Sequence, residues 1–236
     1  MDKCIFGIAC IACVTLSSTA QAALHDRGGG LVYDDVLNVT WLQDANYAMT
    51  SGYDADGRMT WQDALDWAFN LSYYDSIRNA TYTDWRLPAT TDTGAPGTQC
   101  TNSGTDCGRN VSPASSEIAH LFFVSLGNLS DLTTTGASSG AREGGSNPGS
   151  TLDNLGSFIN FRSNFYWSGT EYAPDTFFAW TFDTGYGIQN VNGKTNSFFA
   201  LAVRPGDVAP VPEPETYALM LVGLGLVGLA ARRRVQ

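Results

Sequence analysis

The chain has few charged residues, and few of those are basic. Charged residues make up 15% of its 236 residues, and 13 Lys and Arg stand against 23 Asp and Glu, so the formal net charge is -10 at pH 7. An acidic surface is repelled by nucleic acid and by anionic lipid headgroups. The composition therefore argues against nucleic acid and against a lipid surface as partners.

The chain also has only two histidines, His25 and His120. No Ser or Cys nucleophile motif accompanies His120, so we interpret it as an ordinary helix residue that is exposed or partly buried. No Ser-His-Asp set can be proposed, and no carboxylate pair for glycoside hydrolysis stands out in a chain this acidic. We expect no enzyme activity and no cofactor.

The N-terminus has the pattern of a secretory signal peptide over residues 1–22. Lys3 gives a positive first region, residues 5–16 are apolar, and Ala20, Gln21 and Ala22 form a small-x-small cleavage site for signal peptidase. The mature chain is predicted to start at Ala23.

Five cysteines are present, and three of them leave with the signal peptide. The exported body keeps Cys100 and Cys107, an even pair in an oxidising compartment, and we expect one disulfide. A metal site is the alternative, and it lacks two further ligands at a suitable spacing.

The C-terminus, residues 211–236, combines a Pro-Glu-Pro element, an apolar run and a basic end. The run at 217–231 has fifteen residues, which is short for the roughly 20 that a bilayer core requires. We expect a single transmembrane helix there, with the basic residues on the cytoplasmic side and the body outside. The residues of this segment are Val211, Pro212, Glu213, Pro214, Arg232, Arg233 and Arg234.

This segment resembles the PEP-CTERM sorting signals of Gram-negative bacteria that make extracellular polysaccharide. The resemblance implies that an exosortase cuts near the Pro-Glu-Pro element, so the inner-membrane anchor is transient and the body passes to the cell surface or extracellular matrix. An ordinary tail anchor is the alternative. It does not require Pro212 and Pro214, which break helix and strand before the span.

Between the two signals, residues 23–205 suffice for one domain, followed by a short linker at 206–210. The spacing predicts a helix from Thr60, its N-cap, with Trp61, Leu65, Ala68 and Phe69 facing inward.

A second helix is predicted from Ser116 to Gly127. Its inward residues are expected to be Ile118, Leu121, Phe122 and Leu126.

Elsewhere, short β-branched or aromatic runs are separated by Gly, Asn and Asp, which indicates strands. Residues 177–189 and the run to Val203 are predicted to form consecutive antiparallel strands, joined by turns at Asp183 and Asn192. With two helices, short antiparallel strands and long irregular loops at 89–114 and 130–157, we expect an α+β fold.

Seven blocks in series resemble the bacterial Lcl C-terminal domain family, over about residues 31–205. They are residues 31–34, 40–42, 61–64, 84–88, 116–118, 166–168 and 202–205. The resemblance implies a C-type-lectin-like fold. The family's namesake is a collagen-like surface adhesin whose C-terminal domain binds sulfated polysaccharides, but no collagen repeat is present here, so only the domain is comparable.

C-type lectins that bind sugar through calcium use Glu-Pro-Asn or Gln-Pro-Asp together with Trp-Asn-Asp, and neither motif occurs here. Calcium is therefore unsupported, and ordinary turn chemistry is the better interpretation of Asp54, Asp56 and Gly57. The same fold carries formylglycine-generating enzymes, which makes an enzyme of that kind a second alternative. That activity needs a reactive cysteine pair, and few groups near Cys100 and Cys107 would lower a thiol pKa.

Within the matched blocks we expect structural roles for Trp85, Arg86, Leu87, Pro88, Trp167 and Arg204. A guanidinium of Arg86 stacked on indole, with its donors tied to carbonyls, would fix the start of the first long loop. The alternative makes Arg86 a ligand for an anion or a sugar.

The remaining candidate ligand residues are Tyr172, Trp180, Asp183 and Tyr186, around the late strands. Aromatic rings commonly stack on sugar faces, although core packing is the default for most of them. The sequence thus predicts a noncatalytic adhesion protein that contacts extracellular polysaccharide or a neighbouring surface protein. An inert matrix or scaffold protein is the alternative.

Overall fold

The computed structural model describes residues 24–93, 106–143, 149–208 and 222. The predicted signal peptide, Cys100 and, apart from Val222, the predicted sorting segment lie outside these residues. Within the described part of the chain, no helix has the length and apolar character needed to cross a membrane.

A four-stranded antiparallel sheet joins the two ends of the body. Its order is β1 (Leu24–Gly28), β2 (Leu31–Asp34), β3 (Val39–Leu42) and β12 (Val203–Pro205). The last strand of the body pairs with the third along its full length. The beginning and the end of the body therefore lie in one sheet.

The second sheet has six strands. Their order is β4 (Arg58–Met59), β11 (Phe198–Phe199), β8 (Phe165–Glu171), β9 (Phe178–Asp183), β10 (Ile188–Gly193) and β7 (Gly108–Arg109). The predicted antiparallel pair on either side of the turn at Asp183 is confirmed as β9 and β10.

The predicted continuation of this antiparallel series to Val203 is wrong. After β10 the backbone N–H of Trp61 donates to the carbonyl of Lys194 at 3.0 Å, which leads the chain toward the start of α2. There β11 enters between β4 and β8 and runs parallel to β8, with the Phe198 ring packed against Trp167 at 5.0 Å. The following strand, β12, joins the other sheet.

The predicted helix from Thr60 is confirmed as α2 (Trp61–Asn70), with the Thr60 side chain accepting a hydrogen bond from the backbone N–H of Asp63. Its inward face differs from the prediction, because Leu65 is only partly buried and Phe69 is 78% exposed. Trp67 takes the core side instead. A helix turns by about 100° per residue, so Phe69 lies about 200° from Trp67 and faces solvent.

The second predicted helix is present in two parts, α3 (Glu117–His120) and a π-helical turn, η2 (Leu121–Ser125), preceded by the 3₁₀ turn η1 (Pro113–Ser115). Ser116 is its N-cap, and the four residues expected to face inward are all buried. His120 is only 8% exposed, so it is more deeply buried than the exposed or partly buried position that we predicted.

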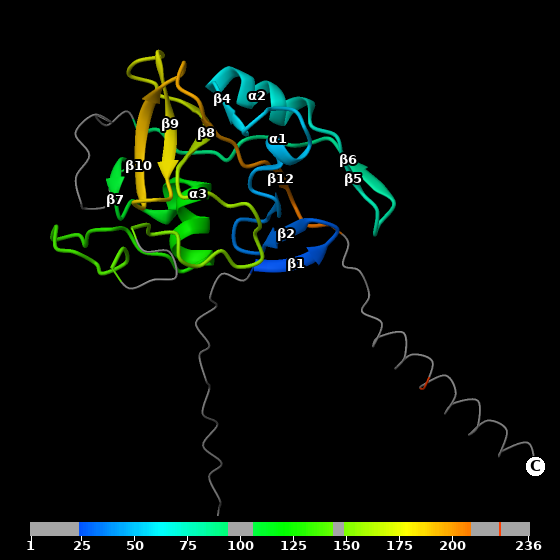
Figure 1. The fold of residues 1–236 in the computed structure, drawn as a ribbon, viewed down its shortest axis with the longest axis horizontal. Coiled ribbons are helices and arrows are strands. Elements are labelled where there is room, and N and C mark those ends of the chain that lie inside the picture. The colour runs from blue at the N-terminus through cyan, green and yellow to red at the C-terminus, as the bar shows by residue number, and fades with distance from the viewer. Residues whose placement is uncertain (1–23, 94–105, 144–148, 209–221, 223–236) are drawn as a thin grey trace, which may run out of the picture.

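Two smaller elements complete the fold, the short helix α1 (Tyr47–Thr50) and the hairpin of β5 (Tyr73–Asp75) and β6 (Ala80–Tyr82). The hairpin projects from the side of the body next to α2 (Figure 1).

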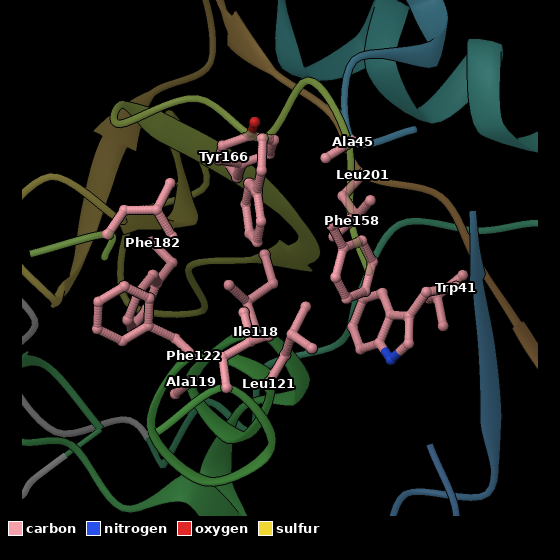
Figure 2. Packing of buried hydrophobic residues seen from close by; sticks show 14 of the residues in the cluster. Trp41, Ala45, Ile118, Ala119, Leu121, Phe122, Phe158, Tyr166, Phe182 and Leu201 are labelled. Atoms are coloured by element: carbon pink, nitrogen blue, oxygen red, sulfur yellow. The ribbon is translucent and has the colours of Figure 1, made fainter. Parts of the chain in front are cut away.

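Two large hydrophobic clusters and one small one lie within the described residues, and neighbouring residues of one strand contribute to different large clusters. Tyr166 of β8 belongs to the first, with Ile118 and Phe122, and Trp167 belongs to the second, with Trp61 and Trp85. Figure 2 shows the residues of α3 and η2 directed toward Tyr166 in the first cluster. Successive side chains of a strand point to opposite faces, so both clusters share the same strands. The fold is α+β and mostly sheet.

Candidate functional site

The Arg86–Glu117 ion pair holds the start of the first long loop against α3. The Arg86 guanidinium donates through both terminal nitrogens to the Glu117 carboxylate, at 2.6 and 2.8 Å, and also to the carbonyl of Leu87 at 3.1 Å. Hydrogen bonding to this carboxylate raises the pKa of Arg86, although burial opposes the shift, so the guanidinium stays charged. Arg86 thus has the predicted structural role, and its main partner is the carboxylate of Glu117.

The loop that follows Arg86 is fixed on both sides. Thr90 forms an isolated antiparallel bridge with Ser116, and the backbone N–H of Thr91 donates to the carbonyl of Ser115 at 2.6 Å. On the other side, Thr90 exchanges two hydrogen bonds with the Thr170 side chain, which lies on β8. The backbone of this loop is therefore held at a set position before any ligand arrives.

A cleft of about 490 Å³ opens beside this loop. Half of its lining residues are apolar, namely Val36, Leu37, Ala89, Pro113, Ala114 and Val124, and the other half are polar. The polar residues are Thr90, Thr91, Ser115, Ser116, Glu117 and His120. Groups of this kind can bind the hydroxyl groups of a small polar ligand.

His120 stands out within this cleft. Its Nε2 atom is buried and has no hydrogen-bond partner among the described residues. A buried polar atom without a partner costs about 1–3 kcal/mol, so His120 carries such a cost at the wall of the cleft.

A second hollow of about 270 Å³ is lined in part by Arg86. Leu65, Phe69, Trp85 and Leu87 give it an apolar lining, and Asp66 and Arg86 provide the charges. The exposed ring of Phe69 offers a flat apolar face at its edge. Because Arg86 lines this hollow and its partner Glu117 lines the cleft, the two depressions border the same ion pair.

Two of the predicted ligand residues lie in the core. Tyr172 is 4% exposed and Trp180 is fully buried, and their rings pack edge to face with centroids 5.6 Å apart. Cys107 belongs to the same small cluster. This position counts against Tyr172 and Trp180 as ligand contacts, since a buried ring has no free face for a sugar.

The other two, Asp183 and Tyr186, lie at the turn between β9 and β10, away from the cleft and hollow linings. Tyr186 is 39% exposed, and the Arg142 guanidinium covers one face of its ring at 4.1 Å. Asp183 is buried and accepts a hydrogen bond from the backbone N–H of Gly185 at 2.8 Å. The structure does not bring the four predicted ligand residues together into one site.

The other matched-block residues make internal contacts. Trp85 and Trp167 are buried and donate through their indole nitrogens to backbone carbonyls. The carbonyl of Pro88 accepts from β8, and Arg204 donates through two nitrogens to the Asp84 carboxylate at 2.8 and 3.0 Å. These contacts support the structural roles expected from the sequence.

Cys107 is buried and disulfide-bonded, and the other cysteine of the predicted pair lies outside the described residues, so the pairing itself stays a prediction. Asp54 accepts hydrogen bonds from the backbone N–H groups of Asp56 and Gly57, the turn chemistry that we expected. Across the described ranges, no group of three His, Cys, Asp or Glu side chains is placed to hold a metal ion.

Several cleft residues were not found by sequence reasoning. Glu117 and Phe69 were placed in predicted helices, but Arg86 and Glu117 stand 31 positions apart in the sequence, and no local signal indicates that they pair. Thr91 lies in a loop and Ser115 in the 3₁₀ turn η1, and neither belongs to a sequence motif. The periodicity of α2, counted from Trp67, is the one signal that could have placed Phe69 on the outside.

Comparison with protein families matches residues 210–234 to the PEP-CTERM protein-sorting motif. Comparisons with curated proteins and with solved structures found no match to the chain. The matched segment follows directly after the described body, which ends at Val208. It supports an exported surface protein that is sorted by an exosortase.

Proposed function

We propose that the body is a noncatalytic binding domain that holds a neutral polysaccharide across the cleft and the Phe69 hollow, which both border the Arg86–Glu117 pair. The observation that carries this proposal is the pairing of a cleft with a mixed apolar and hydroxyl lining and an exposed aromatic ring beside one ion pair. Sugars present hydroxyl groups at their edges and apolar C–H groups on their faces, so they suit both kinds of lining.

The charge of the body favours a neutral polymer over an anionic one. The segments outside residues 24–208 carry a net charge of +1, so the body carries -11. Arg86 is already paired with Glu117, and it offers little attraction to a polyanion. We therefore expect binding that depends little on salt concentration.

The proposal includes the route and the fold expected from the sequence. Signal peptidase removes residues 1–22, the C-terminal helix anchors the protein briefly in the inner membrane, and exosortase processing delivers the body to the cell surface or matrix. The proposed domain is C-type-lectin-like and related to the Lcl C-terminal domain. Its support is the seven sequence blocks, several of which supply buried residues of β2, β3, α2, β8 and β12.

The test is titration calorimetry of the exported protein, recovered from its host, with the neutral fraction of the host's extracellular polysaccharide. We expect saturable heat that persists in high salt. Thr91→Val and Phe69→Ala should each weaken the affinity by about 2- to 10-fold, the range for loss of one good contact. Phe177→Ala is the matched control, because Phe177 is exposed and lies outside both linings.

Absence of heat from a demonstrably folded sample would overturn the binding role and favour a scaffold protein. Binding that disappears in high salt would instead indicate an anionic ligand. Weakening by Phe177→Ala equal to that by Phe69→Ala would place the site elsewhere.

A further inference from the structure

The end of the body is clamped onto the four-stranded sheet, and the clamp extends almost to the sorting motif. We define the tail clamp as Arg27, Asn38, Thr40 and residues 206–208. Arg27 of β1 donates to both carboxylate oxygens of Asp207, at 2.9 and 2.6 Å. The sequence assigned residues 206–210 to a linker, but the first three are attached to the body.

Backbone contacts reinforce this ion pair. The backbone N–H of Gly206 donates to the carbonyl of Asn38 at 2.8 Å, and the Thr40 hydroxyl donates to the carbonyl of Gly206 at 2.7 Å. Gly206 has φ +72°, a conformation that favours glycine. Val208 is 3% exposed and packs in the second hydrophobic cluster.

Arg27 is itself held in place. Its guanidinium lies over the Tyr33 ring at 5.1 Å, and its backbone carbonyl accepts a hydrogen bond from Arg78 at 2.5 Å. The tail is therefore attached to residues that the rest of the body fixes.

The matched sorting motif begins at residue 210, so Ala209 alone separates it from the clamped chain. Each extended residue adds at most about 3.6 Å, which leaves a processing enzyme very little free chain on the body side of the motif. Cleavage of a chain this close to a packed, hydrogen-bonded segment requires that segment to open locally.

We propose that Arg27 and Asp207 act as positioning residues for processing: the tail clamp holds the sorting motif close to the body, and the processing enzyme acts on the form in which the clamp has opened. This inference rests on the sorting motif and goes beyond polysaccharide binding, so either proposal can fail without the other.

The test is pulse-chase labelling of the full chain in its host, with separation of the precursor from the processed product. Arg27→Ala and Asp207→Ala should each speed processing by about 2- to 5-fold, as expected for the loss of one partly exposed bidentate pair. Insertion of Gly-Ser-Gly-Ser after Val208 should also speed processing, because it supplies free chain without loss of the ion pair. The exchanged pair Arg27→Asp with Asp207→Arg should return the rate toward that of the wild type.

Arg58→Ala serves as the control, since it removes an exposed arginine from β4 in the other sheet. Thermal unfolding of the processed product separates faster processing from general destabilisation. Unchanged or slower processing in both Arg27→Ala and the insertion variant would overturn the proposal. Failure of the exchanged pair to slow processing relative to Arg27→Ala would also contradict it, because the ion pair would then have no specific part.

Discussion

Aspartate side chains in this protein serve mainly as acceptors for the backbone of turns. At least eight of them accept a hydrogen bond from the N–H of the second residue after them: Asp26, Asp34, Asp44, Asp54, Asp56, Asp75, Asp175 and Asp183. This arrangement is typical of Asx turns. Many of the aspartates therefore serve to form turns. For this reason the acidic composition argued against nucleic acid and lipid as partners but did not point to a ligand site.

Asp183 gives a prediction at this scale. Burial raises the pKa of Asp183, and the backbone N–H groups of Gly185 and Tyr186 only partly offset it. The folded state thus binds the proton more tightly than the unfolded state, so this group's contribution to stability is present at acid pH and is lost as pH rises through the folded pKa. Asp183→Asn keeps an acceptor for Gly185 and should be at least as stable as the wild type at pH 7.

Urea unfolding of both proteins from pH 4 to pH 7 checks this expectation. The stability of the wild type should decline relative to the variant as pH rises. Asp175→Asn, at an exposed turn with the same hydrogen-bond pattern, is the matched control. A wild type that gains stability over the variant with rising pH would contradict the assignment.

At the scale of elements, the sequence predicts where α2 begins, but only the fold determines which face of α2 is buried. Thr60 and Asp63 identify its start, because a capping hydroxyl and an acidic residue three positions later are local signals. The identity of its buried face is not local. Of the two rings at positions 67 and 69, Trp67 is the one buried in the second hydrophobic cluster, to which Leu87 and Trp167 also belong. The same reasoning explains β11, whose parallel partner β8 is set by packing at Trp167.

The two faces of α2 should respond very differently to substitution. Trp67→Ala removes a buried ring and should cost about 3–5 kcal/mol of unfolding free energy. Phe69→Ala changes an exposed ring and should stay within about 0.5 kcal/mol. Chemical denaturation of the two variants measures the difference. Equal losses would mean that Phe69 is part of the core and is not available to a ligand.

At the scale of the whole molecule, the two large hydrophobic clusters are interleaved along shared strands. Leu31 and Val32 of β2 belong to different clusters, and so do Trp41 and Leu42 of β3. Short β-branched and aromatic runs predicted several strands, including β9 and β10, but not β1 or the hairpin of β5 and β6. The order of the strands within each sheet could not be predicted from the sequence, because paired strands such as β3 and β12 come from opposite ends of the body.

This interleaving predicts a single cooperative unfolding transition. Loss of either cluster exposes the other face of the same strands, so neither can persist alone. Tryptophan fluorescence and far-UV circular dichroism should therefore give coincident urea curves. Two separated transitions would show that the clusters unfold independently, as separate domains do.

The pairing of β12 with β3 also governs when the protein can finish folding. In the proposed export route the chain crosses the membrane from its N-terminus, so β1, β2 and β3 emerge long before the strand that completes their sheet. Because β12 and the tail clamp are the last parts of the body to appear, the sheet closes only as the sorting segment itself reaches the membrane. Completion of the fold and arrival of the sorting signal are thus nearly simultaneous events on the outer side of the membrane.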